Sequence, residues 1–328
     1  MASRLDRAIA AGVEYLGGRL GRRMTWRDFA VPGVTAGSTE CVTAFIAAQL
    51  GPIPEGRALA ARAITAVAAR PRAGGGWGYR EDVPADCDST AWVLLAASAT
   101  GVGLPGELVA RAAAFLTSHQ DANGGFATYG QGARTSLTPA DQPGWFEPEV
   151  SVTSSAVMAL AETGMADPDR LRAARDFLTR QCAEGLWASY WWVGFGYATH
   201  LALSALSRID GTAPAELTRA EHALISRHRP GGGWANDDGA IGNAFSTAFA
   251  LRTLLLTGGD LAEHNAVAHS LAWLSGLHAP ADAEMLAPGA AAGDDLLLRD
   301  SGPVTTAAVV RTLHEARTRL VQAVPLAV

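Results

Sequence analysis

Six segments of the chain share a threonine followed by a run of apolar residues. Each run carries almost no charge, so it predicts a helix that is buried on nearly all sides. The threonines recur at separations of 46 to 63 residues, which indicates an internal repeat. We therefore predict six buried helices that start near Thr43, Thr90, Thr153, Thr199, Thr247 and Thr306.

Amphipathic segments alternate with these apolar runs. They place Arg and Glu on one face and Ala, Leu and Ile on the other, and several begin with Pro or Asp, as helices often do. Six buried helices that alternate with six half-exposed ones fit a closed ring of inner helices wrapped by outer helices. The predicted fold class is all-α, an (α/α)6 toroid that spans residues 1–328 as a single domain. An open solenoid of helix pairs is the alternative.

Glycine-rich turns separate the helices of several repeats. Residues 120–126, 181–187 and 228–234 read QDANGGF, QCAEGLW and HRPGGGW, and a related turn surrounds Trp77. The spacing Gln-x3-Gly-x-Trp resembles the QW motif of the squalene/hopene cyclases and the related prenyltransferase β-subunits. We expect the Gln to bond free carbonyls at the end of an outer helix, the glycines to let the chain turn, and the aromatic ring to stack on the Gln amide. This motif carries no chemistry.

Candidate chemistry lies just before the threonines, because the N-termini of all inner helices point to one end of a toroid and surround one mouth of its cavity. Only the second repeat brings two carboxylates to this mouth, Asp86 and Asp88, and the third repeat adds Glu149. Neighbouring carboxyls in a buried site are a physical route to an acid that keeps its proton at neutral pH. The residues two positions before the threonines are Cys41, Asp88, Ser151, Tyr197, Phe245 and Val304.

The segment 86–91, DCDSTA, resembles the Asp-x-Asp-Asp-Thr-Ala signature of class II terpene cyclases. In that family the middle Asp is the general acid that protonates an alkene or an epoxide. The resemblance implies Asp88 as the general acid and Asp86 as its partner, and Ser89 stands where the family has a third acid. The alternative is that these residues only cap a helix.

Aromatic side chains gather before the third, fourth and fifth buried helices. Aromatic faces stabilise a carbocation without attacking it, by about 0.5–2 kcal/mol each. Packing in the core is the alternative for these aromatic residues. Glu149 is expected to act as a second acid, as a base that quenches a cation, or as a metal ligand. We expect a substrate pocket lined by Cys41, Ser89, Trp145, Phe146, Trp191, Trp192, Phe195, Tyr197, Asn243 and Phe245.

Composition narrows the choice of partners and compartment. A net charge of -6 gives no general attraction to nucleic acid. Three cysteines are too few for a disulfide framework or a Cys-rich zinc module. No apolar run is long enough to predict a membrane span, and the first residues lack the apolar core of a signal peptide. We therefore expect a cytoplasmic protein.

Metal and nucleotide cofactors are not expected. The related protein prenyltransferases bind zinc in the same type of ring, but an alignment on Thr90 puts Asp88 in place of the ligand Cys and Thr305 in place of the ligand His. No nucleotide-binding glycine motif follows a strand pattern. Mg²⁺ becomes relevant only for a diphosphate substrate. The loop arginines that a diphosphate would then require are Arg72, Arg80, Arg134 or Arg299.

The leading hypothesis is a cofactor-free, class II terpene cyclase-like enzyme. It uses Asp88 to protonate an isoprenoid or similar polyene, and it directs cyclisation or rearrangement in an aromatic-lined cavity. One alternative is a non-catalytic toroid that binds a lipid or a partner protein. Another is a different acid-catalysed reaction, such as hydration, dehydration or hydrolysis. An apolar cavity next to Asp88 favours an enzyme, and a plugged toroid favours a binding protein.

Overall fold

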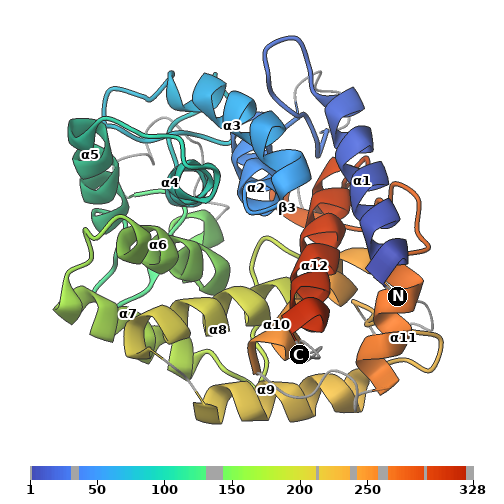
Figure 1. Ribbon diagram of the computed structural model, residues 1–328. Coiled ribbons are helices and arrows are strands. Elements are labelled where there is room, and N and C mark those ends of the chain that lie inside the picture. Colours follow the sequence, from blue (N-terminus) through green and yellow to red (C-terminus); the bar gives the residue numbers. More distant parts are fainter. Residues whose placement is uncertain are drawn as a thin grey trace.

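The computed structural model describes residues 2–30, 37–130, 143–211, 214–236, 242–257, 265–291 and 294–322. Within these residues twelve α-helices form two concentric layers (Figure 1). The inner helices are α2 (Glu40–Leu50), α4 (Cys87–Thr100), α6 (Val150–Glu162), α8 (Gly196–Asp210), α10 (Ala244–Thr257) and α12 (Pro303–Gln322). The outer helices are α1 (Ala2–Arg19), α3 (Pro54–Ala68), α5 (Gly106–Thr117), α7 (Pro168–Arg180), α9 (Pro214–Arg227) and α11 (Asn265–Leu274).

The inner helices form a closed ring. Each inner helix packs against the next one along the chain, and the last, α12, packs against the first, α2. This contact excludes the open solenoid and confirms the predicted (α/α)6 toroid. Each outer helix packs on the inner helices beside it. None of the described helices combines the length and the apolar character needed to cross a membrane.

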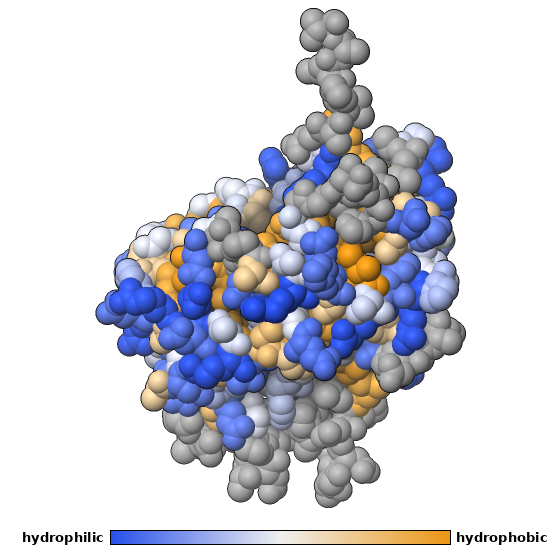
Figure 2. Space-filling model, turned by 90° about the horizontal axis from the view of Figure 1, so that it is seen from below, coloured by the Kyte–Doolittle hydropathy of each residue, from blue (hydrophilic) through white to orange (hydrophobic). Residues whose placement is uncertain are grey.

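The outer helices are amphipathic because they have one neighbour layer and one solvent face. On α7, for example, Ala174, Phe177 and Leu178 are buried, and the remaining positions are mostly Arg and Asp. Figure 2 shows the result on one face of the molecule, where hydrophilic residues surround smaller hydrophobic areas. The inner helices α6 and α10 lack such a polar face, as their almost uniform burial requires.

The repeated threonine joins the two layers. It is the fourth residue of every inner helix, and in five repeats its hydroxyl accepts the backbone N–H of the aromatic residue that ends the turn before that helix. In the second repeat the backbone N–H of Trp77 donates to Thr90 Oγ1 at 3.0 Å, and its indole N–H donates to the Val67 carbonyl at the end of α3, also at 3.0 Å. The aromatic residue therefore satisfies a free carbonyl of the outer helix and fixes the start of the inner one.

One expected detail of these turns is wrong for Gln120. Its side chain bonds the carbonyls of Gly124 and Arg170 rather than the end of its own helix. The sixth repeat also differs from the other five, in that Thr305 rather than Thr306 accepts the backbone N–H groups of the turn. The Thr306 hydroxyl has no hydrogen-bond partner among the described residues.

Two short antiparallel pairings accompany the helices. β1 (Phe126–Ala127) pairs with β2 (Pro148–Glu149), and β3 (Glu284–Ala291) forms a hairpin with β4 (Asp294–Arg299). The sequence does not predict this hairpin, because residues 284–299 contain Pro and Gly and lack a sustained alternation of polar and apolar positions. β3 also pairs with the loop before α8, where Trp192 lies opposite Met285. The hairpin therefore lies beside the N-terminal end of the inner helices.

Candidate active site

Asp86 is the N-cap of α4. Its carboxylate accepts the backbone N–H and the hydroxyl of Ser89, both at 2.7 Å. Burial raises the pKa of Asp86 to about 6, although the bonds from Ser89 oppose this shift. Helix capping is therefore a correct description of Asp86, and Ser89, in the place of a third acid, holds it there.

Asp88 does not cap its helix. Its carboxyl points to the neighbouring inner helix α6, where the hydroxyl of Ser155 donates to Asp88 Oδ1 at 2.6 Å. Burial raises the pKa of Asp88 to about 8, against the bonds from Ser155 and Trp92, and the charges of Asp86 and Glu149 raise it further. At neutral pH the carboxyl is therefore protonated.

Glu149 is the N-cap of α6, in the position that Asp86 has on α4. Its carboxylate accepts the N–H and the hydroxyl of Ser151, at 2.9 and 2.6 Å, and the N–H of Val152 at 2.6 Å. Burial nevertheless raises the pKa of Glu149, because the carboxylate lies away from water. The side chain is thus held by the start of α6, and it affects Asp88 through its charge.

The remaining polar residues of the predicted pocket have separate places. Cys41, on α2, lies next to Asp88, and burial together with that carboxyl raises the pKa of its thiol well above the usual value. Asn243 caps α10, where its side-chain oxygen accepts the N–H of Ser246 at 2.9 Å and its amide donates to the Asp282 carbonyl at 2.7 Å. Asn243 is therefore held in a capping role.

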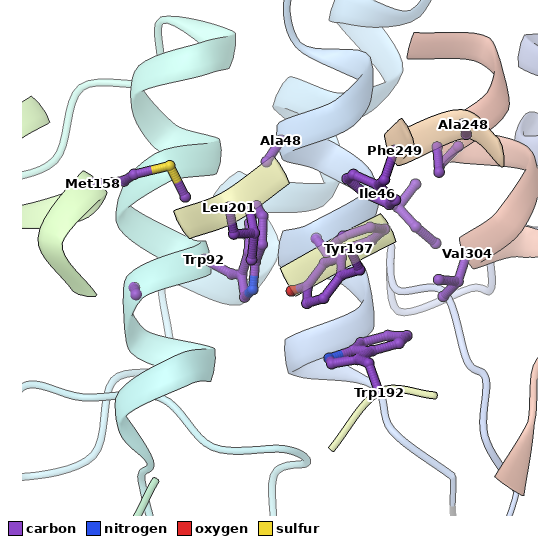
Figure 3. Close-up of a cluster of buried hydrophobic side chains, with 14 of the residues drawn as sticks. Ile46, Ala48, Trp92, Met158, Trp192, Tyr197, Leu201, Ala248, Phe249 and Val304 are labelled. Carbon is purple, nitrogen blue, oxygen red and sulfur yellow. The ribbon is translucent and has the colours of Figure 1, made fainter. Parts of the chain in front are cut away.

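The predicted aromatic residues form two groups. Trp192, Tyr197 and Phe245 pack together, with ring centroids 4.8 Å apart for Trp192 and Tyr197 and 5.2 Å apart for Trp192 and Phe245. Phe195, at the start of α8, is half-buried against the core. The first group continues with residues that the sequence did not single out. We define the central aromatic cluster as Phe45, Trp92, Trp192, Tyr197, Phe245 and Phe249. Figure 3 labels Trp92, Trp192, Tyr197 and Phe249 of this cluster.

The second group lies around Tyr129. Trp145 and Phe146 pack against this ring, at 5.7 and 6.2 Å between centroids, and Trp191 packs against Trp145 at 5.7 Å. The indole N–H of Trp191 donates to Thr128 Oγ1 at 2.8 Å, so its ring points away from its neighbour Trp192. No ring contact joins this group to the central aromatic cluster within the described parts of the chain. Only the central cluster surrounds the axis beside Asp88.

A comparison with known protein families gives one match that covers most of the chain. Residues 66–282 match the squalene-hopene cyclase C-terminal domain. The chain belongs to this family. Lanosterol synthase from Homo sapiens is 33% identical in an alignment of 155 positions that covers 41% of this chain and 21% of the synthase. Alpha-onocerin synthase LCD from Lycopodium clavatum is 26% identical in an alignment of 230 positions that covers 60% of this chain and 30% of that enzyme.

The whole fold has a close structural relative. The type II terpene cyclase MstE from Scytonema, solved in complex with its substrate geranylgeranyl dihydroxybenzoate, matches with a TM-score of 0.83 and 26% identity. The match covers 97% of this chain and 98% of that one, whereas the chain spans less than a third of the length of the curated synthases. The squalene-hopene cyclase-like toroid predicted from the repeats is confirmed.

The residues of this cyclase-family ring that the sequence missed share one position. Phe45, Trp92, Ser155 and Phe249 each lie two residues after a repeated threonine, and thus four residues after the axial position that the sequence singled out. Residues four apart lie on the same face of a helix, one turn further along. Reading the same face one turn deeper would have found them.

At the predicted mouth, side chains of the described residues pack together. Trp192 lies on Tyr197 and Phe245, and its backbone pairs with β3. An axial pocket of about 200 Å³ lies towards the C-terminal ends of the inner helices, and Trp92 lines it. The pocket therefore reaches to within one helical turn of Asp88.

The loop arginines considered for a diphosphate are engaged elsewhere. Arg72 pairs with the buried Glu40 at 2.6 Å, and Arg80 pairs with Asp82, also at 2.6 Å. Arg299 pairs with Glu284 of the hairpin at 3.1 Å, and residue 134 lies outside the described residues. Within the described ranges, no three His, Cys, Asp or Glu side chains are placed to bind a metal ion together.

Proposed function

We propose that this chain is a class II terpene cyclase-like enzyme in which Asp88 donates a proton to an isoprenoid or similar polyene. The observation that carries the proposal is the state of the Asp88 carboxyl, which is neutral at neutral pH and bonded to Ser155 inside a ring of aromatic side chains. The relationship to MstE, whose substrate carries a geranylgeranyl chain, supports an isoprenoid.

The raised pKa keeps the proton on Asp88, and the groups around the carboxyl favour transfer of this proton to the substrate. When the proton moves to a carbon of the double bond, Asp88 becomes a carboxylate, which Ser155 and the Trp92 indole stabilise through hydrogen bonds. The carbocation that forms is opposite in charge to this carboxylate, and their attraction is strong in a site without water. Faces of the central aromatic cluster stabilise the cation as it moves along the chain.

The other two carboxylates assist without touching the substrate. Asp86 and Glu149 are held by the N-termini that they cap, and the charge of each raises the pKa of Asp88. Their role is therefore to keep the proton on Asp88 until a double bond is in place. The reaction ends when the cation loses a proton to water, or takes up a water molecule that then loses a proton to solvent, and Asp88 regains its proton from solvent.

A non-catalytic binding protein is the second candidate. The specific observation in its favour is the close packing of the central aromatic cluster, in which Phe45 lies 5.0 Å from Trp92 and 6.4 Å from Phe249 between ring centroids. A substrate reaches Asp88 only if these rings move apart. Turnover therefore decides between the two candidates.

The test uses geranylgeranyl dihydroxybenzoate in deuterated water, with product analysis by mass spectrometry. We expect a cyclised product that carries one solvent deuterium. Asp88→Asn removes the transferable proton in a nearly isosteric side chain, so turnover is abolished. Asp86→Asn is expected to reduce turnover less or comparably, through the pKa of Asp88. Asp167→Asn is the control for the loss of a capping carboxylate, because Asp167 caps the outer helix α7.

Circular dichroism of each variant confirms that it is folded. Retained turnover in folded Asp88→Asn would reject the acid assignment. Binding of the probe without any conversion by the wild type would favour the binding protein. A hydrated, dehydrated or hydrolysed product would keep the acid but replace cyclisation by another of the considered reactions.

A further inference from the structure

The axial pocket is built by one repeated position. It is lined by the residues that follow the threonines by five positions, and the residues that follow by nine positions add Glu162 and Arg208 at its outer edge. Figure 3 shows Ala48 and Met158 from this level on the side of the central aromatic cluster that lies away from Trp192. The residues at the five-position level are Ala48, Leu95, Met158, Ser204, Arg252 and Arg311.

Three arginines give this pocket an excess of positive charge. Arg252 and Arg311 share one carboxylate, Glu315, and Arg252 also donates to the side chain of Gln49 at 2.9 Å. Arg208 donates to the Ser204 carbonyl of its own helix at 3.2 Å, and the described residues provide no carboxylate for it. Glu162 is engaged by the hydroxyl of Ser98 at 2.6 Å.

A buried imidazole completes the lining. His200 is 5% exposed, and its Nδ1 has no hydrogen-bond partner in the described part of the chain. Burial and the nearby charges of Arg252, Arg311 and Arg208 lower the pKa of His200 well below its usual value, so the ring is neutral. Buried polar atoms in folded proteins are nearly always bonded. His200 therefore contributes a neutral imidazole with an unbonded nitrogen to the lining of the pocket.

The positions of the three arginines are not explained by compensation of the helix dipoles. Cations are favourable at helix C-termini, and all six inner helices end on this side. Only α8, α10 and α12 place arginines at the pocket, whereas α6 places Met158 and the negatively charged Glu162 there. The arginines are thus gathered on one side of the ring, as recognition of a single anion requires.

We propose that this pocket binds the anionic head group, a carboxylate or a phosphate, of an amphiphilic isoprenoid through Arg208, Arg252 and Arg311. Once the rings of the central aromatic cluster have moved apart, the hydrocarbon chain runs along the axis past Trp92 towards Asp88. The direction of the chain rests on the function proposed above. The head group itself is bound by charge-assisted hydrogen bonds from planar guanidinium groups, which suit both kinds of anion.

The geometry also places the reacting double bond. Asp88 and Leu95, which marks the level of Arg252 and Arg311, are seven residues apart on α4. At a rise of 1.5 Å per residue they are separated by roughly 10 Å along the axis. The proton is therefore delivered far from the head group, to a distal double bond of the chain.

The experiment measures binding through quenching of tryptophan fluorescence at low salt. The probes are geranylgeranyl dihydroxybenzoate, its methyl ester, geranylgeranyl diphosphate and geranylgeraniol. We expect the wild type to bind at least one anionic probe about tenfold or more tightly than its uncharged counterpart. The better of the two anions identifies the head group as a carboxylate or a diphosphate.

Arginine variants locate the site. Arg208→Gln and Arg311→Gln should remove most of the preference for the anion, while affinity for the uncharged probes stays within about twofold. Arg180→Gln is the matched control, because Arg180 also lies in the last turn of its helix and donates to a carbonyl, that of Asn123, but on the outer layer. Arg208 is exposed, so its variant is informative even if Arg311→Gln does not fold.

Equal affinity of the wild type for charged and uncharged probes overturns the proposal, and so does an equal effect of Arg180→Gln. Because binding needs no turnover, the same titration in Asp88→Asn separates the two proposals. An anion preference in that variant without any activity in the wild type retains the head-group site and rejects the cyclase. Turnover by the wild type without an anion preference retains the cyclase and rejects the head-group site.

Discussion

Removal of the Ser155 hydroxyl is the most direct test of the acid. This hydroxyl donates to Asp88 at 2.6 Å and lowers the pKa of that carboxyl by stabilising its anion. A hydrogen bond to a charged group is worth about 1.5–3 kcal/mol, which corresponds to about one to two pKa units. In Ser155→Ala we expect the pKa of Asp88 to rise by that amount from its value of about 8.

The pH profile of kcat/KM reports this change. In the proposed mechanism the neutral form of Asp88 is the proton donor, so we expect the wild-type rate to be constant at neutral pH and to fall above a pKa of about 8. In Ser155→Ala the fall moves to higher pH. The plateau also drops by about tenfold to hundredfold, because the carboxylate that forms in the transition state has lost its donor.

Ser154→Ala is the matched control for this profile. Ser154 is the preceding residue on α6 and is fully buried, but its hydroxyl donates to the Val150 carbonyl of the same helix at 2.7 Å. The alkaline limb of this variant should stay at the wild-type pH. Equal shifts in both variants, or a shift of Ser155→Ala to lower pH, would show that the titrating group is not the carboxyl that Ser155 contacts.

Three further predictions concern stability and metal content. Burial and the charge of Asp28 raise the pKa of Asp300 to about 7, so wild-type stability falls as the pH rises from the unfolded value near 4 towards 7. Asp300→Asn should therefore stabilise the protein at pH 8, by up to about 4 kcal/mol, and have little effect at pH 4 in urea denaturation. Thr247→Val leaves the buried N–H of Trp234 without its acceptor and should cost about 1–3 kcal/mol, whereas Thr306→Val, at a hydroxyl without a partner among the described residues, should cost almost nothing. Elemental analysis should find no stoichiometric zinc, and one zinc per chain that is lost on mutation of Asp86 or Asp88 would contradict this.

The helices of the ring could be predicted because their pattern is local. A helix buried on all sides is recognisable from its lack of charge, and the threonine that fixes its start recurs as its fourth residue. The sixth repeat departs from this pattern, since Thr305 accepts the backbone N–H groups that the fourth residue of the helix accepts in the other repeats. The sequence did not predict the hairpin of β3 and β4, because its two strands lack a regular alternation of polar and apolar positions.

The aromatic residues were predicted less well, because their direction depends on loop backbone. Trp191 and Trp192 are adjacent in the sequence, yet one bonds Thr128 and the other stacks on Phe245. In a helix, by contrast, the period determines which residues share a face. The arginines of the axial pocket were overlooked for another reason. Arg252 is the only charged residue of α10, and Arg311 directly follows the apolar run of α12, so neither changes the pattern that identifies those helices.

In this ring, the position of a residue relative to the repeated threonine determines whether its side chain caps an inner helix or faces the axis. The residues four positions before the threonine precede the inner helices and include the caps Asp86, Glu149 and Asn243, whose side chains bond the first free N–H groups. The residues two positions before it face the axis, and Asp88 is the only carboxyl among them. Within one turn of α4 the two carboxyls therefore have different partners. Asp86 caps the helix, and the carboxyl of Asp88 remains available to bond Ser155 of α6. Asp88 is therefore the residue at this level for which we propose the acid role.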